Sequence, residues 1–184
     1  MVISVDSLVI TVPDNLFIPA ESVSLDGTYQ PGSITQNAGE YRFEAPLDWH
    51  ITISNTGGAL YVGGVVEGDA VTECARCLED AYYHLTGEVE GYFLLPGSDR
   101  ELTEEEEDEY ETLGEDHVID LEPLLRAALV LDMPYIPLCK EDCKGICPTC
   151  GANLNTETCT CNKDDDVDDM NPFAVLKNYH FDNE

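Results

Sequence analysis

The chain has 184 residues and carries 38 Asp and Glu against 8 Lys and Arg, which gives a formal net charge of −30 at pH 7. Proteins bind phosphate backbones mainly through Lys and Arg, so this balance excludes a broad nucleic-acid-binding surface and favours a basic protein partner. The length predicts one domain with at most a small appendage, and a hydrophobic content of 43% suffices for a core. A simpler explanation of the acidity is that it maintains solubility.

The sequence contains no membrane-span pattern, because no segment approaches roughly 18 consecutive apolar residues. Residues 1–13 lack a basic region followed by a long apolar run, so they do not resemble a signal peptide. We therefore expect a cytoplasmic protein without a membrane contact, whose cysteines are reduced.

The first half of the chain predicts β-structure. Residues 2–12 favour one long strand or a strand pair, whereas 19–38 predict loops with short extended pieces. Residues 49–53 alternate apolar and polar side chains, as in a half-buried strand. Further strands are expected at 60–66, 70–74 and 82–95. Strands with turns at this spacing predict an antiparallel sheet or a small barrel.

A helix is predicted at residues 121–131, where apolar residues recur at helical spacing. Asp120 can cap its start, and Pro123 falls in the first turn, where a missing N–H is harmless. Before the helix, residues 99–116 include eleven acidic side chains. A like-charge block of this kind predicts a solvated, mobile loop.

The expected fold class is α+β, with a mainly antiparallel sheet or small barrel, one or two helices and a C-terminal cysteine-rich zinc-binding segment. Five segments follow from the composition. They are a β-rich core (1–98), an acidic mobile loop (99–116), a helix and connector that complete the core (117–138), a cysteine-rich metal-binding segment (139–163), and an acidic tail with a short apolar segment (164–184).

The primary metal site is predicted at Cys147, Cys150, Cys159 and Cys161. The first two, spaced C-x-x-C, form a knuckle whose tight turn points backbone N–H groups at the sulfurs, and Gly151 tolerates the left-handed conformation of such a turn. Zinc takes four tetrahedral ligands, with thiolates at about 2.3 Å. The second cysteine pair supplies the remaining two across an eight-residue loop.

The four remaining cysteines predict a possible second site, which would join the sheet to the C-terminal segment: Cys74, Cys77, Cys139 and Cys143. In an alternative arrangement, Cys139 or Cys143 enters the primary site and the others stay free.

Other chemistries compete with zinc. Reduced surroundings disfavour disulfides, and the β context of the Cys74 pair disfavours thioredoxin-like catalysis. An iron–sulfur cluster also uses four thiolates, although Cys-Pro-x-Cys-Gly is more typical of zinc.

No catalytic signature is present. The four His residues lie away from the cysteines, and a catalytic zinc needs an open ligand position. Near the C-terminus, Pro172 can start a short helix that presents Phe173 and Leu176 on one face. We expect this segment to dock on its own domain or to bind a partner, and in the second case Asn171, Pro172, Phe173 and Leu176 are the contact residues.

Short motifs follow one another in a specific order along most of the chain. They are Cys-Ala-Arg-Cys-Leu at 74–78, Ile-Asp-Leu at 119–121, Pro-Leu-Cys at 137–139, the run at 142–151, Asn-Leu-Asn at 153–155, Cys-Thr-Cys at 159–161, and the segment 171–177. In this order they resemble the YceD family, the large ribosomal RNA subunit accumulation proteins.

The resemblance implies a non-enzymatic role in large-subunit ribosome biogenesis, supporting 23S rRNA accumulation or processing. Because the chain is so acidic, we expect it to act through a basic ribosomal protein or assembly factor, whose cationic face its acidic runs cover in competition with RNA. Direct RNA contact is left open.

The alternative function is a zinc- or thiol-based redox sensor or regulatory interaction protein, in which Cys74 and Cys77 release metal on oxidation. A hydrolytic enzyme would need a water-bearing metal.

Overall fold

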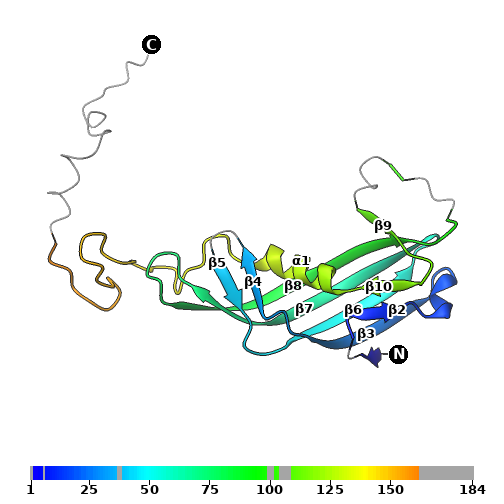
Figure 1. The fold of residues 1–184 in the computed structure, drawn as a ribbon, viewed down its shortest axis with the longest axis horizontal. Coiled ribbons are helices and arrows are strands. Elements are labelled where there is room, and N and C mark those ends of the chain that lie inside the picture. Colours follow the sequence, from blue (N-terminus) through cyan, green and yellow to red (C-terminus); the bar gives the residue numbers. More distant parts are fainter. Residues whose placement is uncertain (1, 6, 37–38, 99–101, 104–108, 162–184) are drawn as a thin grey trace, which may run out of the picture.

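The computed structural model describes residues 2–5, 7–36, 39–98, 102–103 and 109–161. Within these residues, one large open sheet dominates (Figure 1). Its strands are β1 (Val2–Ser4), β3 (Ser22–Tyr29), β4 (Ser33–Gln36), β5 (Gly39–Arg42), β6 (Leu47–Asn55), β7 (Ala59–Glu73), β8 (Asp80–Leu94) and β9 (Tyr110–Thr112). The strand order runs β1-β3-β6-β7-β8-β9, and the β5-β4 hairpin branches from β7. Neighbours are antiparallel except for β1–β3 and β8–β9. The mainly antiparallel sheet that the sequence predicted is therefore present, as an open sheet rather than a barrel.

The β7–β8 hairpin is the longest feature of the sheet. Its register runs from Ala59 opposite Leu94 to Glu73 opposite Asp80, so it carries the loop 74–79 far from the middle of the sheet. The sequence suggested a break near Gly68, but the strand is continuous there. A Cβ on Gly68 would lie 2.3 Å from Leu47 Cδ2. Gly68 therefore provides space for a core side chain rather than a turn.

Residues 19–38 differ most from the prediction. They were expected to form loops with short extended pieces, yet β3 pairs with β6 along its whole length and β4 pairs with β5. Polar residues and Gly27 give this stretch a weak local preference for strand structure, and long-range pairing overrides it. A Cβ on Gly27 would lie 2.6 Å from Trp49 Cζ2, so the glycine makes room for the buried tryptophan.

The helix α1 (Glu122–Asp132) covers the inner face of the sheet and buries Leu125, Ala128 and Leu129. Asp120 Oδ1 accepts a hydrogen bond from the Glu122 N–H at 3.0 Å, and a proline lies in the first turn. A second, two-stranded sheet of β2 (Val9–Thr11) and β10 (Val118–Asp120) completes the core, together with the 3-10 turn η1 (Asp14–Phe17). Helix α1, at eleven residues, is too short to cross a membrane, and no other helix in the described residues is long and apolar enough to do so.

The end of the acidic segment is ordered against the sheet. β9 lies within residues 99–116, which were expected to form a loop, and the Leu113 that follows it is buried. The Leu113 N–H donates to Leu94 O at 2.9 Å, which fixes this part of the segment to β8. Residues 99–101 and 104–108 lie outside the described residues, as do 162–184 with the predicted contact residues Asn171, Pro172, Phe173 and Leu176.

Close packing of α1 on β8 predicts that Gly87→Ala destabilises the fold. The added Cβ would lie 2.6 Å from the Ala128 carbonyl carbon and 2.7 Å from its oxygen, which are backbone atoms of the helix. Overpacking of this kind costs about 1–3 kcal/mol. Urea denaturation measures the loss. The matched control is Gly39→Ala, whose Cβ would meet no atom closer than 3.5 Å, and it should change the unfolding free energy by less than about 0.5 kcal/mol. Equal effects of the two variants would contradict the packing described here.

Candidate metal centres

The eight cysteines gather into two groups of four. In each group the sulfur atoms lie within 4.8 Å of one another. We call Cys74, Cys77, Cys139 and Cys143 the inner cluster, and Cys147, Cys150, Cys159 and Cys161 the outer cluster. These are the two sets that the sequence suggested, and the alternative in which Cys139 or Cys143 joins the outer set is not the arrangement observed.

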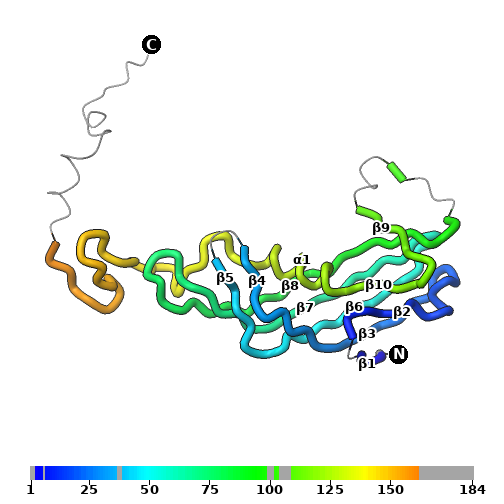
Figure 2. Tube along the Cα trace, viewed as in Figure 1, coloured from blue at the N-terminus to red at the C-terminus, as the bar shows by residue number. Residues whose placement is uncertain are grey.

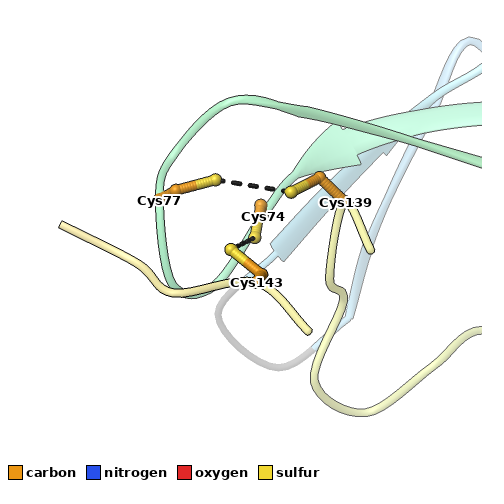
Figure 3. Close-up of side chains that lie close together, drawn as sticks. All are labelled: Cys74, Cys77, Cys139 and Cys143. Carbon is orange, nitrogen blue, oxygen red and sulfur yellow. Dashed lines mark hydrogen bonds between the residues drawn. The ribbon is translucent and has the colours of Figure 1, made fainter. Parts of the chain in front are cut away.

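The inner cluster joins two distant parts of the chain. Cys74 and Cys77 lie in the loop that ends the β7–β8 hairpin, whereas Cys139 and Cys143 follow the connector after α1 (Figure 3). The sulfur of Cys74 lies 3.7 Å from that of Cys143, and the sulfurs of Cys77 and Cys139 are 3.5 Å apart. Cys74, Cys77 and Cys143 are buried. The Cα trace shows residues 134–161 beyond the end of α1, on the hairpin-tip side of the sheet (Figure 2).

Tyrosines hold the connector in place. The Tyr83 hydroxyl on β8 donates to Leu138 O at 2.8 Å and accepts from the Leu138 N–H at 2.6 Å. The Tyr41 hydroxyl on β5 donates to Pro134 O at 2.8 Å. The Ala75 N–H at the hairpin tip donates to Pro137 O at 2.8 Å. These bonds bring Cys139 to the tip of the β7–β8 hairpin.

The two C-x-x-C knuckles share one backbone conformation. In the inner cluster the Leu78 N–H donates to Cys74 O at 3.0 Å, and in the outer cluster the Gly151 N–H donates to Cys147 O at 2.8 Å. The residue that follows the second cysteine is left-handed in both, with φ of +62° at Leu78 and +75° at Gly151. The sequence predicted this role for Gly151. Leu78 adopts the same conformation at a cost of about 1–2 kcal/mol, because its Cβ crowds the backbone.

The outer cluster lies at the end of the described chain and is more exposed. Its sulfur separations are 3.3 Å for Cys147–Cys159 and 3.5 Å for Cys150–Cys159. Cys150 is exposed, and Cys159 and Cys161 are half-buried. The Cys161 N–H donates to the Cys159 sulfur at 3.3 Å. This segment therefore has little core of its own, and the sulfur atoms are its central contact.

Asn155 and Arg76 connect the two clusters, and motif spacing did not identify either role. The Asn155 side chain donates to the Cys143 sulfur at 3.4 Å and accepts from the Lys144 N–H at 2.9 Å. Arg76 donates from its guanidinium to Cys143 O at 2.9 Å, and Arg76 O accepts from the Ile146 N–H at 3.2 Å. An Asn close to a knuckle could have suggested a donor to sulfur. Only the structure shows which sulfur it contacts.

Hydrogen bonds to sulfur lower the pKa of one thiol in each cluster and raise the pKa of another. Burial raises the pKa of Cys74, but N–H groups of Arg76, Cys139 and Cys77 outweigh burial and lower the pKa to about 6. In the outer cluster, the Cys150 N–H and the Cys159 thiol lower the pKa of Cys147 to about 6. The neighbouring thiols Cys77 and Cys159 raise the pKa of Cys139 and Cys161, respectively, to about 12. Crowded sulfurs thus cannot all ionise unless a cation joins them.

Both donor sets fit a tetrahedral metal ion. Four thiolates at about 2.3 Å from a metal lie about 3.8 Å from one another. Four sulfur pairs in the two clusters are 3.3 to 3.7 Å apart, and all sulfurs of a cluster lie within 4.8 Å of one another. In the described residues neither group includes a His or carboxylate ligand. All-thiolate sets of this kind form closed structural sites. Each cluster is therefore able to hold a metal ion.

Comparison with known proteins identifies the family. The family model described as large ribosomal RNA subunit accumulation protein YceD matches residues 62–179. The chain belongs to the YceD family. The matched range contains both cysteine clusters, so the clusters lie in the part of the chain that defines membership. No solved structure matches the chain.

Relatives of the YceD chain occur in bacteria and plants. An uncharacterized protein of Mycobacterium leprae is 31% identical over 115 residues, which is 61% of this chain and 51% of the relative. One from Mycobacterium tuberculosis is 34% identical over 113 residues, 61% of this chain and 54% of the relative. The maize protein named chloroplastic large ribosomal RNA subunit accumulation protein YCED homolog 1 is 45% identical over 47 residues, 25% of this chain and 16% of the relative. The chain spans about half the length of the mycobacterial relatives.

We expect two metal ions per chain, measured by elemental analysis of purified protein. Cys74→Ser and Cys150→Ser should each lose one ion, because each removes one of four ligands from a different cluster. The control Thr149→Ala lies inside the outer knuckle but removes no ligand, and it should retain both ions. A single ion in wild-type protein would contradict the two-cluster arrangement, as would the loss of both ions from either serine variant.

Burial predicts the order in which the ions leave. The outer cluster has one exposed and two half-buried cysteines, whereas three of the inner cysteines are buried. A colorimetric chelator should therefore release metal in two phases. Cys150→Ser should remove the fast phase and Cys74→Ser the slow one. One uniform phase in wild-type protein would contradict the difference in accessibility.

Proposed function

We propose that the chain is a non-enzymatic, zinc-stabilised factor that supports the accumulation of large-subunit rRNA by binding a basic protein partner. The family name supports the link to rRNA accumulation. The plant relatives carry the same description in their names. We retain the cytoplasmic location that the sequence predicts, and a basic ribosomal protein or assembly factor as the partner.

Zinc is the proposed metal in both clusters. Four thiolates without a His or carboxylate favour a closed tetrahedral site, which is the common structural zinc arrangement. Both clusters contain a C-x-x-C knuckle with N–H donors to sulfur. A closed site has no position for a water ligand, and this supports a structural rather than a hydrolytic role.

The outer face of the sheet, turned away from α1, carries the argument for a basic partner. Within β3, β6, β7 and β8, the pleat and registers assign eight carboxylates to this face: Asp26, Asp48, Glu67, Asp69, Glu73, Asp80, Glu88 and Glu90. Arg42 is the one Lys or Arg on this face within the described strands, and it pairs with Asp80 at 3.4 Å. A field of one sign over an open sheet attracts cationic partners and repels phosphate.

Two carboxylates of the acidic face lie directly opposite each other on neighbouring strands. Asp48 and Glu67 are cross-strand partners in the β6–β7 register, and both are exposed. Like charges at such positions destabilise a sheet by a few tenths of a kcal/mol up to about 1 kcal/mol. Asp69 differs, because it bonds to His84 at 2.8 Å and raises the pKa of His84. A cationic side chain from a partner would relieve the repulsion between Asp48 and Glu67.

In the proposed mechanism, the acidic face covers the cationic surface of a ribosomal protein until rRNA replaces it. Both surfaces are polyanionic, so they compete for the same Lys and Arg side chains. The contact residues proposed in the tail, Asn171, Pro172, Phe173 and Leu176, would add an apolar contact to the same partner.

The test is binding to purified large-subunit ribosomal proteins and, separately, to protein-free large-subunit rRNA at physiological salt. We expect the chain to retain basic ribosomal proteins and not the naked rRNA. The triple variant Asp48→Asn, Glu67→Gln, Glu88→Gln should weaken protein binding at least tenfold, because it removes three of the eight carboxylates on the acidic face. Its control is Glu44→Gln, Glu115→Gln, Glu157→Gln, which removes the same charge from exposed positions elsewhere and should bind as wild type.

Retention of protein-free rRNA at that salt would overturn the proposal, and so would equal binding by the two triple variants. Circular dichroism and metal content should be unchanged in both, since neither triple touches the core or a cysteine.

The outer cluster favours a second candidate function, a thiol-based sensor. Cys150 is exposed and Cys159 and Cys161 are half-buried, and accessible thiols are the ones open to oxidation. The sequence suggested sensing at Cys74 and Cys77. Both are buried, and this favours the more exposed outer cluster as the sensing site instead. Reversible metal loss in mild peroxide, with a parallel loss of partner binding, would support sensing. Full metal retention would remove it.

A further inference from the structure

Leu78 occupies a position where glycine would be less strained. The same left-handed position in the outer knuckle is Gly151, which has nothing within 4 Å of where its Cβ would be. Leu78 nevertheless does not pack into the interior, since its side chain is 61% exposed. A bulky residue at positive φ without a packing role is an outlier that points to function.

The Leu78 side chain lines a pocket of about 480 Å³ beside the inner cluster. Tyr135, Ile136 and Pro137 also line this pocket. Tyr135 and Ile136 are 75% and 62% exposed. Three large apolar side chains thus share one concave surface that the rest of the described chain leaves uncovered, and such patches mark interaction sites.

The rim of this pocket is acidic. Glu40 and Glu73 line it and are exposed, and neither has an ion-pair partner among the described residues. Arg42 also lines the pocket, and its guanidinium pairs with Asp80 at 3.4 Å. Apolar side chains beside two exposed carboxylates are complementary to a large apolar side chain flanked by Lys or Arg.

The chain's own apolar segment 171–177 is a poorer match for this pocket. It follows the acidic run 164–169, which contains five Asp residues, and that run would lie against the negative rim. Charge complementarity therefore favours a basic segment from another protein.

We propose that the pocket formed by Leu78, Tyr135, Ile136 and Pro137 is the docking site for an apolar anchor residue within a basic segment of the partner. The proposal rests on the proposed function, for which it names a specific contact. The pocket residues adjoin ligands of the inner cluster: Leu78 follows Cys77 directly, and Pro137 precedes Cys139 by two residues. The Ala75 N–H bond to Pro137 O, at 2.8 Å, connects the two segments. Docking therefore depends on an intact inner cluster.

The test uses two labelled 12-residue peptides, each with four Lys or Arg residues around a central position that is Phe in one and Ser in the other. Fluorescence anisotropy measures binding to the full-length metal-loaded protein. We expect the Phe peptide to bind at least tenfold more tightly than the Ser peptide. Leu78→Gly and Ile136→Ser should each abolish that difference. Ile18→Ser removes an exposed apolar side chain far from the pocket and should leave the difference intact.

Stability separates docking from a structural role of Leu78. Because glycine suits the left-handed position, Leu78→Gly should keep both metal ions and a melting temperature no lower than that of wild type. A lowered melting temperature would show that the leucine is structural and would overturn the proposal. Equal binding of the Phe and Ser peptides to wild-type protein would overturn it as well.

Two further outcomes complete the design. If Phe173→Ala with Leu176→Ala strengthens Phe-peptide binding, the tail occupies the pocket and the proposal is wrong. The acidic-face triple variant should weaken both peptides equally without changing the Phe preference. If the triple variant binds both peptides as tightly as wild type and still prefers the Phe peptide, the acidic face does not contribute to binding. That result would contradict the proposed function but would leave the pocket proposal standing.

Discussion

The convergence of four sulfur atoms at the tip of the β7–β8 hairpin is the contact on which the C-terminal part of the described chain depends. Cys74 and Cys77 come from the loop between β7 and β8, and Cys139 and Cys143 come from beyond α1. The outer cluster has no comparable contact with the core. It is placed through Arg76 and Asn155, both of which bond to the Cys143 region. The inner cluster therefore determines where the outer one lies.

This arrangement explains why the hairpin is so long. β7 and β8 run 15 residues each and carry the first knuckle beyond the part of the sheet that α1 covers. The helix covers one face, and the hairpin tip receives the connector through Tyr83 and Tyr41. The other face remains open and acidic. The fold thus separates a buried scaffold, a cysteine-rich end and a charged surface, and we assign the binding of a basic partner to the last two.

The sequence predicted the parts that have strong local patterns. The helix at 121–131, the strand segments within β6, β7 and β8, and the division of the cysteines into two sets of four follow from periodicity, turn residues and knuckle spacing. β3 and β9 were missed because their strand structure comes from pairing with β6 and β8 rather than from local preference. The sequence could not identify Leu78 as an unusual residue either. Its left-handed conformation becomes significant only when it is compared with Gly151 at the equivalent position of the outer knuckle. The same holds for Asn155, whose donor role needs the position of the Cys143 sulfur.

The central claim is that two closed four-thiolate metal sites hold the cysteine-rich end together. X-ray absorption spectroscopy at the metal edge of the purified protein tests it most directly. The account predicts a zinc edge with four sulfur atoms at about 2.3 Å around the average ion, and no lighter ligand. Nitrogen or oxygen in the ligand shell would contradict it. So would an iron edge with iron–iron scattering, which indicates an iron–sulfur cluster.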